Sequence, residues 1–222
     1  MTILCWLWLP GTVSAQLGTN LKRPLVEVRT ELGVMIIALF NETPAHRDNF
    51  LQHVEANAFD SLLFHRVVPG FGAEAGEPAS KYAKPAAYVD VTPPKDPLPR
   101  TIIPGLIHKH GAISASPAGT EHGMDTLSHD ARFLFVLGVK YEPKELALIE
   151  ERNANRGRAF AYSEADREVY ASVGGAPRLD GGYTVFGEVV EGLDVLEALS
   201  KQPCDQWDRP LKDIRMFMRV LK

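Results

Sequence analysis

Short β-rich runs separated by turn residues constrain the fold of this 222-residue sequence more than any other feature. The first two runs, at 25–30 and 34–40, are separated only by Glu31-Leu32-Gly33, a spacing typical of a β-hairpin. Later runs are equally short and contain the β-branched and aromatic residues that favour strands. They lie at 62–68, 110–115, 133–137, 183–190 and 214–221. Many short strands with few helices predict a closed or nearly closed antiparallel barrel.

A helix is expected after the first hairpin, because Thr43 supplies an N-cap and Pro44 suits the first helical turn. The apolar residues on one face of this helix are Phe50, Leu51, Val54 and Ala58. Another short helix is expected at 193–199. Five prolines between 93 and 104 exclude both a helix and a central strand there, so this part is a long irregular loop within one domain.

Two more helices are expected late in the chain. The first covers 143–156 and ends at Gly157, which favours a helix C-terminus. The second begins at Ser163, with Asp166 three residues later as in a capping box. It ends at the glycine pair 174–175.

Charge and cysteine content exclude several classes of protein. With 24 basic and 28 acidic side chains, the net charge of −4 is unsuited to holding nucleic acid or an anionic membrane by bulk electrostatics. Cys5 and Cys204 alone make neither a disulfide framework nor a cysteine-rich zinc site. His108 and His110 would face one side of a strand, which is weak evidence for a metal without a third ligand; solvent-exposed loop histidines are the alternative. No metal and no cofactor are expected.

The first 21 residues carry no charged side chain. Their apolar run at 3–9 is too short to span a bilayer but has the length of a signal-peptide core, and Val13-Ser14-Ala15 resembles a cleavage site. These features predict a signal peptide at 1–15, a single domain at 16–222, and a periplasmic or secreted protein. A buried N-terminal strand is the alternative. No later stretch approaches 18 apolar residues, so no membrane span is expected.

One octapeptide, at 64–71, reads Phe-His-Arg-Val-Val-Pro-Gly-Phe. Taken alone, it is better explained as an arginine at a barrel rim followed by a core phenylalanine. The octapeptide resembles the signature of cyclophilin-type peptidyl-prolyl isomerases. Later segments resemble further parts of that family in the same order, at 108–113, 133–136 and 179–195. The resemblance runs from about 25 to 221, with expansions at 78–107 and 138–177, and the segment 174–177 is similar to exported cyclophilins of the Bacteroidetes type.

The resemblance implies a mainly β fold: a closed antiparallel eight-stranded barrel capped by helices, with an extra helical insert at about 138–177. It implies a monomeric enzyme that acts on X–Pro bonds of proline-containing polypeptides. Rotation about such a bond faces a barrier of about 18–20 kcal/mol, which a cation lowers by donating a hydrogen bond to the prolyl nitrogen and localising its lone pair. By resemblance, Arg66 is this catalytic donor, Phe71 forms the floor of the proline pocket, and Leu179 lines it.

Several positions expected to bind substrate depart from the family pattern. Gly72 and Glu74 stand where a methionine and a glutamine are usual. Arg132 and Leu134 replace a glutamine and a phenylalanine. Further departures are Ser116 and Pro117 in one strand, Arg178 in place of tryptophan or histidine, and Tyr183 in place of histidine. The smaller apolar surface is expected to weaken proline binding by about 1–2 kcal/mol, roughly tenfold.

Glu74 and Arg132 replace a glutamine pair together, so one hypothesis is that they form an ion pair that orients Arg66. The other is that Glu74 holds Arg66 directly, away from the substrate. The sequence therefore supports two functions: an exported isomerase of folding proteins with reduced or narrowed activity, or a non-catalytic cyclophilin-like module that binds proline-containing segments or a partner protein. The predicted site comprises catalytic Arg66 and substrate-binding Phe71, Glu74, Ser116, Arg132, Leu134, Leu179 and Tyr183.

Overall fold

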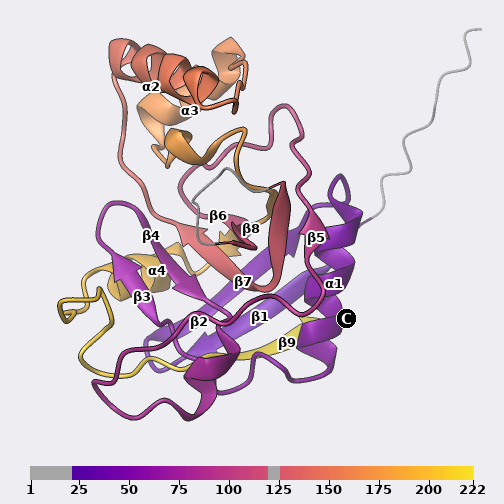
Figure 1. Ribbon diagram of the computed structural model, residues 1–222, viewed down its shortest axis with the longest axis vertical. Coiled ribbons are helices and arrows are strands. Elements are labelled where there is room, and N and C mark those ends of the chain that lie inside the picture. Colours follow the sequence, from indigo (N-terminus) through magenta and orange to yellow (C-terminus); the bar gives the residue numbers. More distant parts are fainter. Residues whose placement is uncertain (1–21, 120–125) are drawn as a thin grey trace, which may run out of the picture.

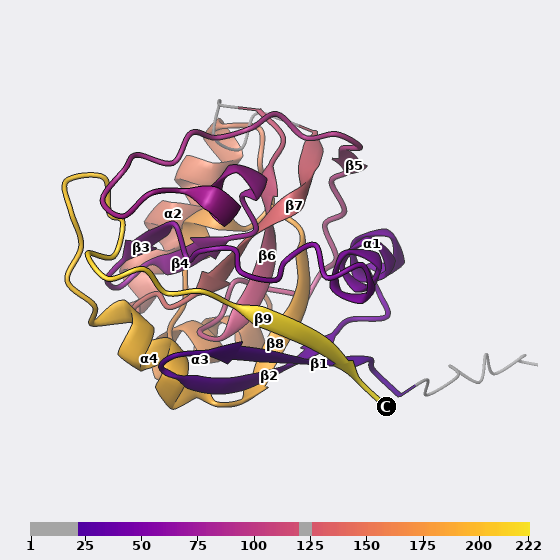
Figure 2. The same ribbon diagram turned by 90° about the horizontal axis from the view of Figure 1, so that it is seen from below.

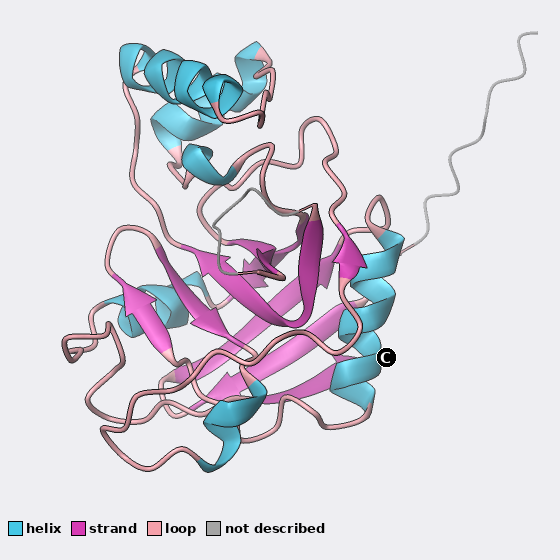
Figure 3. Cartoon of the chain, in the orientation of Figure 1, coloured by secondary structure: helices cyan, strands magenta, loops and turns pink. Residues whose placement is uncertain are grey.

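The computed structural model describes residues 22–119 and 126–222 (Figure 1). The signal peptide predicted at 1–15 and the alternative N-terminal strand both lie outside the described residues. In the described part, strands form the body of the molecule and helices lie around it (Figure 3).

An antiparallel sheet forms this body. Eight strands follow the hydrogen-bonded order β3-β4-β7-β6-β8-β2-β1-β9, and the two-residue strand β5 pairs with β7 beside this path. The strands are β1 Leu25–Thr30, β2 Gly33–Leu39, β3 Arg66–Val68, β4 Gly72–Ala75, β5 Leu98–Pro99, β6 Ala112–Pro117, β7 Leu127–Val136, β8 Val185–Glu191 and β9 Phe217–Leu221. The predicted hairpin at 25–40 is confirmed as β1 and β2, which pair from Leu25–Ala38 to Thr30–Gly33.

The sheet curls until its first and last segments meet. Just before β3, Leu63 forms an isolated antiparallel bridge with Arg215, which lies just before β9. Backbone hydrogen bonds from Phe64 to Ile214 and from Met216 to Leu62 flank this bridge. The strands predicted at 62–68 and 214–221 are therefore shorter than expected, because their first halves close the barrel by a bridge and not by a regular ladder.

Alternate side chains of the strands fill the interior of the barrel. Val26 and Val28 of β1 are fully buried, as a period of two requires. Aromatic rings whose centroids lie 5.1 to 5.7 Å apart form the centre of the core: Phe50, Phe59, Phe64, Phe133, Phe135 and Phe186.

Two helices lie at opposite ends of the barrel and bury their apolar residues in the same core. Helix α1 (Pro44–Glu55) packs against β7, β8 and β9, and helix α4 (Leu193–Ser200) packs against β2, β3 and β4 (Figure 1, Figure 2). Both helices were expected. Phe50 and Val54 are the predicted core residues of α1 that are buried.

Thr43 and Pro44 begin α1 as predicted, but two details of its ends differ from expectation. Thr43 occupies the N-cap position, but its hydroxyl makes no capping hydrogen bond and is buried without a partner. Ala58 is exposed and lies outside the helix, because Asn57 adopts a positive φ of 53° just after the helix end. Phe59 enters the core in its place.

The predicted insert carries helices α2 (Pro143–Asn155) and α3 (Glu164–Ser172), which stack together away from the barrel (Figure 1). The capping box is confirmed: Ser163 Oγ accepts from Asp166 N, and Asp166 Oδ2 accepts from Ser163 N. Two short 3₁₀ helices are η1 (Pro78–Tyr82) and η2 (Pro177–Leu179). The insert has its own apolar cluster, whose buried members are Ile107, Leu146, Tyr162 and Tyr170.

Other strand boundaries differ from expectation for local reasons. The strand predicted at 133–137 begins six residues earlier as β7, because the polar stretch 128–130 hides its period. Tyr183 precedes β8, since its backbone N–H donates to the carbonyl of Leu179 in a turn. The strand predicted at 110–115 is β6, shifted by two residues. Strand β4 was not predicted, because glycine and alanine dominate it.

Candidate active site

Arg66 begins a row of side chains that crosses five strands. In the antiparallel register, Arg66 of β3 lies opposite Glu74 of β4, and Glu74 lies opposite Leu134 of β7. Leu134 lies opposite Ser114 of β6, which in turn lies opposite Val185 of β8. Directly opposed residues share one face of a sheet. The fold therefore places Arg66, Glu74 and Leu134 side by side, facing away from the barrel interior.

A small apolar cluster adjoins this row. It contains four of the residues predicted to bind substrate, namely Phe71, Leu134, Leu179 and Tyr183. Phe71 and Tyr183 are half-buried, whereas Leu134 and Leu179 are buried. The buried residues packed with them are Ala112, Val136, Ala176 and Val185. Residues from β7, from the turn after β3, from η2 and from the segment after η2 thus meet in one apolar surface beside Arg66.

Gly72 and Leu134 depart from the family pattern together, and the structure couples them. A Cβ atom at position 72 would lie 2.5 Å from Leu134 Cδ1 and 2.7 Å from the carbonyl oxygen of Phe135. The leucine side chain therefore lies over the space where the expected methionine would begin. Leu134 thus replaces part of the apolar surface that Gly72 lacks.

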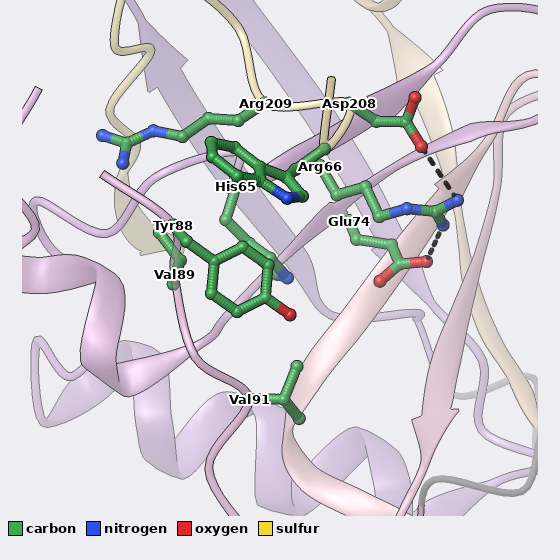
Figure 4. A pocket seen from close by; sticks show the side chains of 9 residues that line it. His65, Arg66, Glu74, Tyr88, Val89, Val91, Asp208 and Arg209 are labelled. Carbon is green, nitrogen blue, oxygen red and sulfur yellow. Dashed lines mark hydrogen bonds and ion pairs between the residues drawn. The ribbon is translucent and has the colours of Figure 1, made fainter. Parts of the chain in front are cut away.

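Two carboxylates, called here the carboxylate clamp, hold the guanidinium of Arg66 (Figure 4). Arg66 Nη1 donates to Glu74 Oε1 at 2.8 Å, and Arg66 Nη2 lies 3.1 Å from Asp208 Oδ2. The three side chains are 38%, 24% and 44% exposed for Arg66, Glu74 and Asp208, so water screens both pairs. The hypothesis that Glu74 holds Arg66 directly agrees with this geometry.

Asp208 reaches Arg66 from the loop that precedes β9. Its backbone has a positive φ of 63°, and its carbonyl accepts a 2.7 Å hydrogen bond from Val67 N of β3. This contact ties the loop to the strand that carries Arg66. The sequence analysis missed Asp208, because nothing in its local sequence indicates a neighbour so distant in the chain.

Arg132 is buried and faces a different carboxylate, so the predicted ion pair between Glu74 and Arg132 is wrong. Arg132 Nε lies 3.8 Å from Glu77 Oε2, and Arg132 Nη2 donates to the carbonyl of Pro117 at 3.2 Å. Glu77 is fully buried and also accepts from the backbone and hydroxyl of Thr92. Burial lowers the pKa of Arg132, while Glu77 and Glu74 oppose that shift. Glu77, another residue the sequence analysis missed, fixes Arg132 and the proline-rich loop together.

Arg178 lies over the ring of Phe71. Its guanidinium carbon is 3.9 Å from the ring centroid, and the arginine side chain is exposed. This geometry is that of a cation–π contact. The floor of the predicted proline pocket is therefore covered by a cation.

Tyr183 and Ser116 complete the predicted set. Burial raises the pKa of Tyr183, Glu74 acts in the same direction, and nearby arginines oppose the shift. Ser116 is 6% exposed and lies two residues from Ser114 on the same face of β6, next to the bulge at Pro117. All eight predicted residues thus lie on or beside one face of the sheet.

Ser114 of the same face also belongs to a buried polar group beneath the insert, the Asp180 network. His108 Nδ1 lies 2.5 Å from Asp180 Oδ1, and His108 Nε2 lies 2.8 Å from Ser114 Oγ. The hydroxyls of Tyr162 and Tyr170 donate to Asp180 Oδ2 at 2.7 and 2.5 Å. Burial, with Asp180 adding to it, raises the pKa of both tyrosines. Ser114 is 0% exposed, so this serine–histidine–aspartate arrangement is closed to substrate and structural.

His108 is therefore not the solvent-exposed loop histidine that was expected. His110 contacts other groups, with Nδ1 2.7 Å from the carbonyl of Leu137 and Nε2 3.4 Å from Glu197. Within 22–119 and 126–222, no three or more histidine, cysteine, aspartate or glutamate side chains gather to hold a metal. Cys204 is a free thiol. In the same part of the chain, no helix combines the length and apolar character needed to cross a bilayer.

A cavity of about 300 Å³ opens beside Arg66 (Figure 4). Tyr88 and Trp207, from two separate loops, meet at its wall with ring centroids 5.8 Å apart. The remaining lining residues are His65, Arg66, Glu74, Val89, Val91, Asp208 and Arg209. The cavity therefore shares Arg66 and the carboxylate clamp with the predicted site.

The curled antiparallel barrel, with an arginine beside an apolar cluster on its outer face, is the arrangement expected of a cyclophilin. The family model described as cyclophilin type peptidyl-prolyl cis-trans isomerase matches residues 25–219. The chain belongs to this family. The predictions of a cyclophilin-like, mainly β fold and of a peptidyl-prolyl isomerase are thereby confirmed.

Similar proteins from two staphylococci carry the provisional name of peptidyl-prolyl cis-trans isomerase. The protein of Staphylococcus saprophyticus is 26% identical over 203 residues, which cover 90% of this chain and 93% of that protein. The protein of Staphylococcus haemolyticus is 27% identical over 191 residues, covering 85% and 86%.

Solved structures of a cyclophilin type isomerase from Cryptosporidium parvum share the fold. One has a TM-score of 0.64 at 17% identity and covers 90% of this chain and 98% of its own. The other, obtained in the presence of the dipeptide Ala-Pro, has a TM-score of 0.61 at 18% identity and covers 89% of this chain and 99% of its own. At this identity the likeness shows the fold alone.

Proposed function

We propose that this isomerase rotates X–Pro bonds with Arg66 as the donor to the prolyl nitrogen, and that the proline ring packs on the apolar cluster of Phe71, Leu134 and Leu179. The observation that carries the proposal is the placement of Arg66 next to this cluster, on one face of the sheet. A bound X–Pro bond then has a charged donor on one side and an apolar socket on the other. Rotation about the X–Pro bond breaks no covalent bond and transfers no proton, so it requires no further catalytic group.

The carboxylate clamp supports a reduced rate. A guanidinium has five N–H donors, and the clamp engages one nitrogen with Glu74 and another with Asp208. The remaining donors can serve a substrate, and the clamp fixes their direction. Two negative charges beside one positive charge weaken the pull of Arg66 on the prolyl lone pair. The clamp therefore improves the orientation of the Arg66 guanidinium but weakens its electrostatic effect on the prolyl nitrogen.

The proposed clients are exported proteins, bound as proline-containing segments by a monomer in the periplasm or outside the cell. The support for this part is the uncharged N-terminal stretch with its apolar run and small residues at 13–15. Proline isomerisation is slow enough to limit folding, so an isomerase in such a compartment speeds the maturation of its clients.

The test is proton-exchange NMR on short Ala-Pro peptides with the wild-type chain and Arg66→Ala. We expect the wild type to accelerate cis–trans exchange and Arg66→Ala to lose about 100-fold or more of that acceleration, as for removal of a charge-stabilising donor. Equal acceleration by both proteins would remove Arg66 from the mechanism.

A second function is favoured by the way both key groups are occupied. The clamp holds Arg66, and Arg178 covers Phe71. A protein whose free state keeps this arrangement would bind proline-containing segments or a partner protein without turnover. In the same NMR experiment, peptide resonances that shift without faster exchange would establish this binding module and reject the isomerase.

A further inference from the structure

The end of the site that carries Arg178 differs from the end that carries Arg66. Around Arg178, the described residues supply an aromatic ring and further cations, but no carboxylate in an ion pair with its guanidinium. Two acidic side chains lie in this neighbourhood, and both are engaged elsewhere. The backbone N–H of Glu142 donates to Glu145 Oε2, and Glu74, which also acts on Tyr183, is paired with Arg66.

Arg158 adds a second cation at the same end. It is 7% exposed, and its side chain packs against the backbone of Gly182, just before Tyr183: a Cβ at Gly182 would lie 2.8 Å from Arg158 Nη1. Among the described residues, the guanidinium of Arg158 has neither a hydrogen-bond nor an ion-pair partner. The stem of Arg158 is thus fixed by packing while its charge has no carboxylate partner, which makes an anionic ligand favourable here.

Tyr183 lies close enough to both cations for each to act on its hydroxyl. Burial raises the pKa of Tyr183 and Glu74 adds to that rise, whereas Arg158, Arg178 and Arg132 oppose it. Burial also lowers the pKa of Arg158, and the neighbouring Arg100 and Arg156 act in the same direction. Positive charge thus accumulates around the half-buried Tyr183, which belongs to the apolar cluster proposed to bind proline.

We propose that Arg178 and Arg158 select polypeptides with an acidic residue adjacent to the proline. The inference rests on the proposed function, because it assigns the neighbouring residue of the same substrate. Arg178 has a double effect in it. While stacked on Phe71, the guanidinium occupies the exposed face of the ring on which the proline would pack. A substrate carboxylate draws the guanidinium aside and uncovers the ring, whereas a neutral substrate must displace it without compensation.

The experiment compares two sets of peptides, Ala-Xaa-Pro-Ala and Ala-Ala-Pro-Xaa, with glutamate, glutamine or lysine at Xaa. Exchange NMR gives kcat/KM, and chemical-shift titration gives affinity. For the wild type we expect glutamate to exceed glutamine by about fivefold in at least one set, with lysine lowest, as for an exposed cation paired with a carboxylate. Raising NaCl from about 0.05 to 0.5 M should reduce that preference by about half.

The decisive variant is Arg178→Ala. It should reduce the preference for glutamate to less than about twofold and raise kcat/KM for the glutamine peptide about two- to threefold, since the ring of Phe71 is then uncovered. Arg158→Met, which keeps the packing against Gly182 without the charge, should reduce the preference partially. Arg152→Ala removes an exposed arginine of α2 and is the matched control, with no effect on either peptide.

The outcomes separate the inference from the proposed function. Equal turnover of the three peptides by the wild type, unchanged in Arg178→Ala, would overturn charge selection while the isomerase stands. If no peptide is turned over but the glutamate peptide binds more tightly in an Arg178-dependent way, the isomerase fails and charge selection stands. Equal binding of all peptides without turnover would overturn both.

Discussion

Arg66 and Arg178 lie at two ends of one binding face, and their partners are opposite in kind. Arg66 is held by two carboxylates at 2.8 and 3.1 Å, whereas Arg178 lies 3.9 Å above the ring of Phe71. The clamp fixes direction and neutralises charge. The aromatic ring fixes position more weakly and leaves the full positive charge available. Arg66 is thus oriented to donate to a prolyl nitrogen at one end, and Arg178 keeps its charge available to attract an anion at the other.

The comparison also explains why the departures from the family pattern occur together. Glutamate at position 74 suits a site that orients its arginine by charge, and Leu134 fits over Gly72. Restoring single residues of the family pattern therefore disturbs their neighbours, as the 2.7 Å approach of a Cβ at position 72 to a backbone oxygen indicates.

The largest expected effect comes from replacing each arginine by lysine. Arg66→Lys keeps the charge but loses the fork that reaches Glu74 and Asp208 at once, so exchange of an Ala-Pro peptide should slow about 100-fold. Arg178→Lys keeps a cation near Phe71, so the preference for glutamate over glutamine should stay above about threefold. Exchange NMR measures both.

Thermal unfolding of the two lysine variants is the control, because both side chains are partly exposed and their midpoints should stay within a few degrees of the wild type. Equal losses of turnover in the two variants would contradict the assignment of catalysis to Arg66 and of charge selection to Arg178.

The stability of the fold limits the pH range in which Arg66 and Arg178 can be compared. His46 of α1 is buried, and burial lowers its pKa to about 4. The unfolded chain therefore binds this proton first. Stability from His46 is complete above its ordinary pKa of about 6.5 and is lost as pH falls towards 4, by up to about 3 kcal/mol.

Denaturant unfolding at several pH values checks this dependence against His46→Leu. The variant should lose that part of the acid sensitivity and be at least as stable at pH 7.5, since both ring nitrogens of His46 are buried without partners. His65 and His129, whose pKa values burial also lowers, should retain their share of the acid effect in both proteins.

The smallest effect tests the clamp itself. Asp208→Asn should raise kcat for a neutral Ala-Pro peptide about threefold with little change in KM. The variant removes one of the two negative charges beside Arg66, while Glu74 still orients the guanidinium. Asparagine tolerates the positive φ at this position, so the backbone contact to Val67 N is kept. Asp90→Asn, an exposed neighbour on the loop beside the cavity, is the matched control. A fall in kcat for Asp208→Asn would show that Asp208 assists catalysis.

The barrel and most of the site follow from the sequence because they depend on local pattern. Alternating apolar residues define β1, a continuous apolar run defines β2, and the octapeptide around Arg66 and Phe71 identifies the family. The registers that bring Leu134 next to Glu74 follow once that family is known.

The contacts that tune the site could not be predicted, since they join distant segments through single side chains. Asp208 reaches Arg66 across 142 positions by way of a loop held to β3. Arg132 was assigned to Glu74 by analogy with a glutamine pair, but the buried Glu77 lies closer to it. The burial of His108 could not be predicted either, because its partner Asp180 lies 72 positions later.

The Asp180 network prevents the insert from being removed without further changes to the protein. Tyr162 and Tyr170 belong to the insert, His108 and Ser114 belong to the barrel, and Asp180 directly follows Leu179 of the apolar cluster. Excising 138–177 to obtain a minimal domain would leave a buried carboxylate without two of its donors, at the base of the segment that shapes the pocket. A shortened protein therefore needs a redesigned residue at position 180, because the insert is a structural part of the cyclophilin-like domain.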